Sequence, residues 1–174
     1  MLRILGKIQR LGIVTDIVPA SSEAALVEIG EQLKARVGEQ FAGSLAIRQV
    51  DAGSCNGCEL EIHALNNPYY SIERYGVHFV ASPRHADLLL VTGPVSRHME
   101  EALRRTYEAT PEPRLVIAVG ECGASGGEFG VSYASCGAVA NVIPVDAVIR
   151  GCPPTPLALM RGILEVIARR SSDR

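Results

Sequence analysis

The chain has 174 residues, of which 47% are hydrophobic and 21% are charged, and its formal net charge is −2 at pH 7. A chain of this length and composition can bury a core and is too apolar to be disordered. The absence of a basic stripe argues against nucleic acid as a partner. No run of about 20 apolar residues and no signal peptide are found, so the sequence predicts neither a membrane span nor export.

The chain is expected to divide into an N-terminal arm and helix over 1–43, which contacts a partner, and an α/β domain over 44–174. In residues 1–20, apolar positions at helical spacing alternate with basic ones. This pattern favours either a short helix docked on a subunit or a basic amphipathic segment at a membrane surface. Residues 22–37 are predicted to form a helix that ends at Gly38. The buried stripe of this helix is expected to comprise Leu26, Ile29, Leu33 and Val37.

An alternation of strands and helices begins near residue 44. Strands are expected at 44–50, 76–81, 88–92, 115–119 and 145–149, and helices at 59–65, after Ser96 and after Thr155. The runs 88–92 and 115–119 are continuously apolar, which is typical of strands buried on both faces of a parallel sheet. The sequence therefore predicts a doubly wound α/β fold, in which ligands bind beyond the carboxyl ends of the strands.

Four of the five cysteines directly follow predicted strands. Cys55 and Cys58 form a C-x-x-C pair after the first strand, Cys122 follows the strand at 115–119, and Cys152 follows the last strand. Because these strand ends share one edge of a parallel sheet, we expect the four thiols to converge there. Four thiolates are the ligand set of an iron–sulfur cubane, and Cys-Pro is a known ending for such a set. Cys136 lies outside the pattern and is expected to be a buried thiol.

Three other interpretations of the cysteines remain open. A structural zinc site also uses four cysteines, although its ligands usually come as two close pairs and only one is present here. A thioredoxin-like dithiol at Cys55 and Cys58 would leave Cys122 and Cys152 without a role. The third alternative is ordinary buried cysteines without any metal.

The residues around the cysteines suggest how the site is built. The run Gly123–Gly127 is expected to form a turn that brings peptide N–H groups to the sulfurs. The helix after Thr155 would point its positive end toward the same place. Glu59 and Glu61 are expected either to favour the dipole of their helix or to form a polar contact with another subunit, and the second alternative includes a proton route.

Four segments of the chain resemble a known family: 55–62, 82–90, 120–127 and 143–156. They resemble the small, electron-transferring subunit of group 4 membrane-bound [NiFe] hydrogenases of the formate hydrogenlyase type. The related 20-kDa-type subunit family of NADH:quinone oxidoreductase has the same flavodoxin-like fold. That family carries adjacent cysteines at the first ligand position, whereas this chain has the C-x-x-C spacing of the hydrogenases. The resemblance covers about residues 45–168.

The resemblance implies that Cys55, Cys58, Cys122 and Cys152 hold one [4Fe–4S] cluster close to a nickel–iron centre in a separate large subunit. The implied partners are that large subunit, a ferredoxin-like iron–sulfur subunit and membrane-embedded subunits. The complex would lie at the cytoplasmic face of the membrane, and this chain would have no bond-breaking site. Two alternatives are an equivalent subunit of a quinone-linked or sulfur-reducing complex without nickel, and a zinc-stabilised interaction module.

Overall fold

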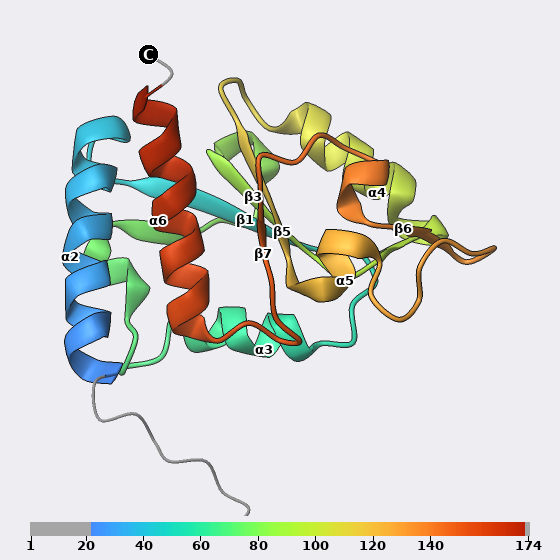
Figure 1. The fold of residues 1–174 in the computed structure, drawn as a ribbon. Helices are drawn as coiled ribbons and strands as arrows, with labels where there is room; N and C mark the ends of the chain where they lie inside the picture. The colour runs from blue at the N-terminus through green and yellow to red at the C-terminus, as the bar shows by residue number, and fades with distance from the viewer. Residues whose placement is uncertain (1–21, 173–174) are drawn as a thin grey trace, which may run out of the picture.

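The computed structural model describes residues 22–172, so the helix or amphipathic segment expected within residues 1–20 lies outside the described part of the chain. A parallel sheet lies between two layers of helices (Figure 1). Helices α2 (Ser22–Gln40) and α6 (Pro156–Ser172) lie side by side on one face, and α4 (Arg97–Ala109) covers the other. This arrangement confirms the predicted doubly wound α/β fold.

The sheet has five strands in the order β2-β1-β3-β5-β7, all parallel. They are β1 (Leu45–Asp51), β2 (Val77–Phe79), β3 (Leu88–Thr92), β5 (Leu115–Val119) and β7 (Ala147–Ile149). This is the strand order of flavodoxin-like sheets, in which the chain reverses its direction of winding between β1 and β3. Every residue of β3 and β5 is buried, as their continuous apolar sequences predict.

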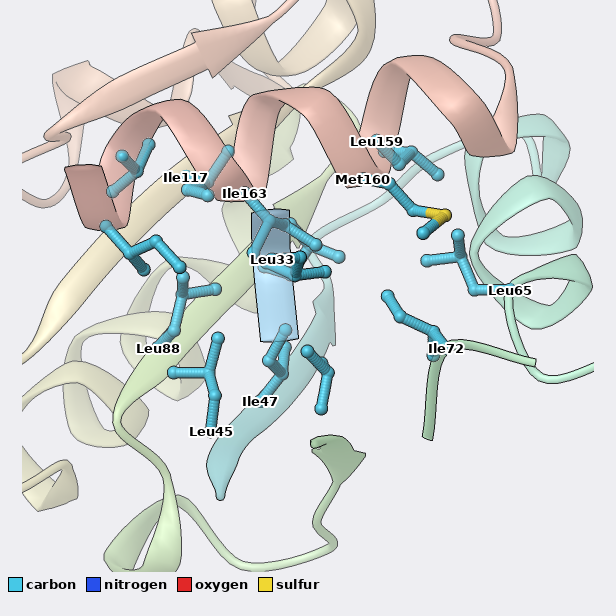
Figure 2. Packing of buried hydrophobic residues seen from close by; sticks show 14 of the residues in the cluster. Leu33, Leu45, Ile47, Leu65, Ile72, Leu88, Ile117, Leu159, Met160 and Ile163 are labelled. Carbon is cyan, nitrogen blue, oxygen red and sulfur yellow. The ribbon is translucent and has the colours of Figure 1, made fainter. Parts of the chain in front are cut away.

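The larger hydrophobic core lies between the sheet and the α2–α6 layer. Leu33 and Val37 of α2 are fully buried and pack with Ile47 of β1 and Ile163 of α6 in one cluster (Figure 2). The four residues of the predicted α2 stripe are all buried. Helix α2 is therefore packed on the sheet together with α6, and whether it also contacts a partner remains a prediction.

Helix α4 covers the opposite face of the sheet, where Leu103 packs against Leu89 and Val91 of β3. Ser96 caps this helix through a 3.3 Å hydrogen bond from the Met99 amide to its hydroxyl. The expected ion pairs Glu100–Arg104 and Glu101–Arg105 are present at 3.1 and 2.8 Å. Thr155 caps α6 in the same way, with Ala158 N donating to its Oγ1 across 3.3 Å.

Some predicted boundaries are wrong. Helix α2 continues past Gly38 to Gln40, whose side-chain amide donates to the carbonyl of Ile167 in α6 across 2.9 Å. The strands expected at 76–81 and 145–149 are shorter than predicted, and the segment Gly120–Ser125 forms a short helix, α5, where a turn was expected.

The remaining elements are short. Helix α3 (Gly57–Ala64) follows β1, and β4 (Val95–Ser96) pairs with β6 (Ser135–Gly137) in a separate antiparallel ribbon. Three 3₁₀ turns, η1 (Ile72–Tyr75), η2 (Pro83–His85) and η3 (Val139–Asn141), complete the described chain. No helix in residues 22–172 is long and apolar enough to cross a membrane.

Candidate functional site

The three cysteine-bearing turns lie together at the carboxyl edge of the sheet. In Figure 1 the start of α3 and the turn between β7 and α6 lie together at the lower edge of the molecule, and helix α5 lies just above them. Cys55 and Cys58 follow β1, Cys122 lies in α5 directly after β5, and Cys152 follows β7. The strand order places the ends of β1, β5 and β7 along one side because all run in the same direction. The predicted placement of these four cysteines at one edge is therefore found in the fold.

The first turn is shaped by side chains that accept backbone hydrogen bonds. Asp51, the last residue of β1, accepts from the amides of Gly53 and Ser54 at 2.8 and 2.9 Å. The hydroxyl of Ser54 accepts from the Asn56 amide at 3.2 Å, and Asn56 takes a left-handed conformation with φ of 72°. These contacts direct the chain from the strand into α3, so that Cys55 precedes the helix and Cys58 lies in its first turn.

Glu59 is buried beside the C-x-x-C pair, with only 4% of its surface exposed. One carboxylate oxygen accepts a hydrogen bond from the Ser54 hydroxyl, while the other, Oε1, has no partner among the described residues. Burial of a carboxylate requires partners, because an unpaired charge loses its hydration. Sequence reasoning placed this acid near the start of a helix and missed its burial and its contact with Ser54.

Two contacts join the turn of Cys122 to the turn of Cys152. The amide of Glu121 donates to the carbonyl of Gly151 across 3.0 Å, and Arg150 pairs with the Glu121 carboxylate at 2.9 Å. The first turn also touches the last, since a Cβ atom added to Gly57 would lie 3.6 Å from the Cys55 sulfur and 3.8 Å from Pro153. The ends of β5 and β7 are thus connected directly, and Pro153 extends the contact to the C-x-x-C turn.

Two glycines with positive φ lie against cysteine sulfurs. A Cβ atom at Gly120 would lie 2.7 Å from the Cys58 sulfur, and one at Gly127 would lie 2.7 Å from the Cys122 sulfur. Neither position accepts a larger residue without displacing a sulfur, and the φ angles of 80° and 54° are strained for any other residue. The backbone at these two glycines therefore packs directly against the sulfurs of Cys58 and Cys122.

The thiols differ in exposure and lie within electrostatic range of one another. Cys55 and Cys152 are exposed, Cys122 is partly exposed and Cys58 is buried. Burial, followed by the negative charge of Glu59 and the other three cysteines, raises the pKa of Cys58 to about 11. Burial and the neighbouring Cys152 and Cys55 also raise the pKa of Cys122. Burial, together with the neighbouring negative charge, therefore disfavours the thiolate forms of Cys58 and Cys122, and a bound cation would offset this effect.

The four cysteines can be compared with the donors that a metal site requires. Among residues 22–172 no three Cys, His, Asp or Glu side chains are grouped so as to hold a single metal ion. A mononuclear zinc site draws four sulfurs to about 2.3 Å from one centre. A four-iron cubane instead binds each cysteine to a different iron, so its ligands stand at separate corners. The donor set of four cysteines around a glycine-lined edge fits such a cubane, and it also matches the ligand set of a structural zinc site.

The run Gly123–Gly127 does not act as predicted. Within the described chain, none of its peptide N–H groups donates to a cysteine sulfur. The run belongs partly to helix α5, so the Gly126 amide donates to the carbonyl of Cys122 at 2.8 Å and the Gly127 amide to the Ser125 hydroxyl at 3.4 Å. Its contribution is the close approach of Gly127 to the sulfur.

Cys136 lies apart from the other cysteines. It is buried in β6 and its thiol donates to a carboxylate oxygen of Glu100 in α4 across 3.2 Å. Burial and this hydrogen bond raise the pKa of the thiol. Its surroundings agree with the expected buried thiol.

Known proteins share this fold and sequence. Residues 55–166 match the family described as "NADH ubiquinone oxidoreductase, 20 Kd subunit". The chain is 44% identical over 130 residues to formate hydrogenlyase subunit 7 of Escherichia coli K12, covering 75% of this chain and 51% of that protein. It is 48% identical over 115 residues to the "probable membrane-bound hydrogenase subunit mbhJ" of Pyrococcus furiosus, covering 66% of this chain and 69% of that protein.

A solved structure agrees with these sequence matches. A chain of the membrane-bound sulfane sulfur reductase, an archaeal respiratory membrane complex, superposes with a TM-score of 0.64 at 34% identity, covering 80% of this chain and 76% of that one. The fold and the matches define a subunit of oxidoreductase complexes. The chain belongs to the 20-kDa subunit family of NADH:ubiquinone oxidoreductase. It spans about half the length of formate hydrogenlyase subunit 7.

Proposed function

We propose that this chain is the electron-transfer subunit of a membrane-associated oxidoreductase complex and carries one [4Fe–4S] cluster held by Cys55, Cys58, Cys122 and Cys152. The observation that carries the proposal is the convergence of these four cysteines, from three separate turns, at the carboxyl edge of one sheet. Such a cluster, when bound, accepts and releases single electrons. The chain would fix its position and tune its potential through burial and neighbouring charge.

The protein residues have separate tasks in this proposal. Gly120 and Gly127 leave room for two of the liganding sulfurs. The contacts from Glu121 to Gly151 and Arg150 would help to keep the turns of Cys122 and Cys152 together. Cys55 and Cys152, which are exposed in the lone chain, would face the neighbouring redox subunit and be covered by it. No bond-breaking residue is assigned to this chain.

We further propose that the complex is a [NiFe] hydrogenase whose nickel–iron centre lies in a separate large subunit. Two relatives with high identity are named as hydrogenlyase and hydrogenase subunits. The C-x-x-C spacing of Cys55 and Cys58 supports the same assignment. The other partners would be a ferredoxin-like iron–sulfur subunit and membrane-embedded subunits, with this chain held peripherally at the cytoplasmic face.

A second candidate is the equivalent subunit of a sulfur-reducing or quinone-linked complex without nickel. It is supported by the likeness to the sulfane sulfur reductase chain, of which 76% is covered. Both candidates give this chain the same cluster and the same role, so they differ only in the neighbouring catalytic subunit.

The deciding experiment is to tag this chain, purify the intact complex from membranes without oxygen, and measure iron, acid-labile sulfide, nickel and hydrogen-dependent dye reduction. Iron and sulfide with nickel and hydrogen activity are expected for the hydrogenase. Iron and sulfide without nickel or hydrogen activity would assign the chain to the nickel-free relatives. Zinc in place of iron and sulfide would overturn the cluster assignment itself.

A further inference from the structure

A cavity of about 270 Å³ opens at the edge of the sheet between β1, β2 and the end of α3. It exists because β2 is short: its last residue, Phe79, pairs with Ile47, so no strand lies beside Arg48 on that side. The mouth of the cavity is reached from the surface, since His63 and Asn66, which line it, are both exposed.

Arg48 forms no ion pair within the described part of the chain. The six ion pairs found there use Arg36, Arg97, Arg104, Arg105, Arg114 and Arg150. The Nε atom of Arg48 is enclosed and has no hydrogen-bond partner. An arginine is always charged and offers five N–H donors, and the fold is destabilised when an enclosed donor such as this Nε–H has no acceptor. Among the described residues, no aspartate or glutamate lines the cavity.

The other residues that line the cavity indicate which kind of ligand would fit it. His63, Asn66 and Gln49 carry side chains that can donate hydrogen bonds, and Ile62 and Phe79 provide apolar wall. The guanidinium of Arg48 is a planar fork that can bind a carboxylate through two parallel hydrogen bonds. The apolar wall suits a short aliphatic stem that leads to the carboxylate.

We propose that this cavity binds an aliphatic carboxylate, with Arg48 as its principal contact. The carboxylate comes either from an Asp or Glu side chain of a neighbouring subunit or from a free small carboxylic acid, because both present the same group. The proposal does not involve the four cysteines and does not depend on the cluster. It gives a role to Arg48, a charged residue that has no other role in the fold or in the proposed electron transfer.

The first arm of the test compares Arg48→Met and Arg48→Lys with wild type and with Arg105→Met as a matched control. Arg105 lies on α4 and does not line the cavity, and it is exposed and paired with Glu101. The tagged complex is immobilised and washed with rising concentrations of sodium chloride. If a subunit provides the carboxylate, Arg48→Met should release its neighbours about tenfold faster than wild type, and Arg48→Lys should lie between. Arg105→Met should match wild type.

The second arm uses only the wild-type complex, so it does not depend on a variant that folds. Arg48 and Arg105 are labelled with the arginine reagent phenylglyoxal, with and without glutarate, and quantified by mass spectrometry. If the carboxylate is free, glutarate should slow labelling of Arg48 about tenfold and leave Arg105 unchanged.

The two arms together distinguish a subunit carboxylate from a free acid and both from no binding. Faster release in the first arm supports a subunit carboxylate, and protection in the second supports a free acid. Equal release for Arg48→Met and Arg105→Met, together with no protection by glutarate, would overturn the proposal. The iron content of each preparation is measured in parallel, so a failure of the cluster assignment shows as missing iron while the release and labelling results stand independently.

Discussion

The α-carbon of Gly120 lies so close to Cys58 that a Cβ atom added there would come within 2.7 Å of the cysteine sulfur. Gly120→Ala is therefore expected to displace the sulfur and to lower the iron bound per chain at least severalfold. Gly130→Ala is the matched control, because Gly130 also has a positive φ but nothing lies within 4 Å of its added Cβ. Gly130→Ala should lower the free energy of unfolding only by the backbone strain, about 1 kcal/mol. This variant should retain its iron. Equal iron in both variants would show that Gly120 does not shape the site.

The ligand set predicts a sharp division among the cysteines. Serine at position 55, 58, 122 or 152 should remove or distort the electron paramagnetic resonance signal of the reduced cluster, because an alcohol is a poorer ligand than a thiolate. Cys136→Ser should leave the signal intact, since Cys136 contacts Glu100 on another element. Survival of the signal without Cys122, or its loss without Cys136, would mean that the ligand set is wrong.

Helix α2 should contribute to the stability of the whole chain. Leu33 is fully buried among residues of the sheet and α6, whereas Val27 on the same helix is 49% exposed. Leu33→Ala should lower the free energy of unfolding by about 3 kcal/mol, while Val27→Ala should change it by less than about 0.5 kcal/mol. Urea unfolding measured by circular dichroism provides the comparison. Similar values for the two variants would mean that α2 unfolds separately from the sheet.

The hydrogen bond between Cys136 and Glu100 should affect stability in acid. The thiol of Cys136, and after it Arg104, lowers the pKa of the Glu100 carboxyl below its ordinary value of 4.5. The carboxyl thus ionises more readily in the folded chain, so it stabilises the fold above about pH 4.5, and this contribution is lost as the pH falls through the lowered pKa. Cys136→Ala should move the acid-unfolding midpoint to higher pH.

Cys136→Ser is the matched control for this prediction, because a serine hydroxyl still donates a hydrogen bond to Glu100. Its acid-unfolding midpoint should stay closer to the wild-type value. Wild type, Cys136→Ala and Cys136→Ser are measured with the same iron content. Any loss of iron in acid then affects all three proteins equally. Identical midpoints for the alanine and serine variants would show that the donor does not set the pKa of Glu100.

The elements that the sequence predicts best are those defined by their own side chains, without tertiary contacts. Strands 88–92 and 115–119 were placed correctly because a short apolar run between polar segments suits only a strand buried on both faces. The position of Cys122 and Cys152 at the ends of strands followed from the same runs. Ser96 and Thr155 marked the starts of their helices because short polar side chains there satisfy free amides.

Elements that depend on tertiary contacts were not predictable. Helix α5 begins at Gly120 and contains Gly123, both poor helix formers, so the segment was assigned to a turn. The ribbon of β4 and β6 is only two and three residues long and has no periodicity to detect. The burial of Glu59 and the cavity at Arg48 arise from segments that meet only in the folded chain.

The connection between the amide of Glu121 and the carbonyl of Gly151 has a consequence for the order of assembly. It brings together two turns whose cysteines, Cys122 and Cys152, are 30 residues apart, and Cys122 is itself 64 residues beyond Cys58. Any group bound to all four thiols would close both of these long loops at once, as a cross-link does. Cys152, the last of the four cysteines, follows β7, which is the final strand of the sheet in chain order. Loading of the site would therefore report that the sheet is complete, and a copy truncated before β7 could not be loaded.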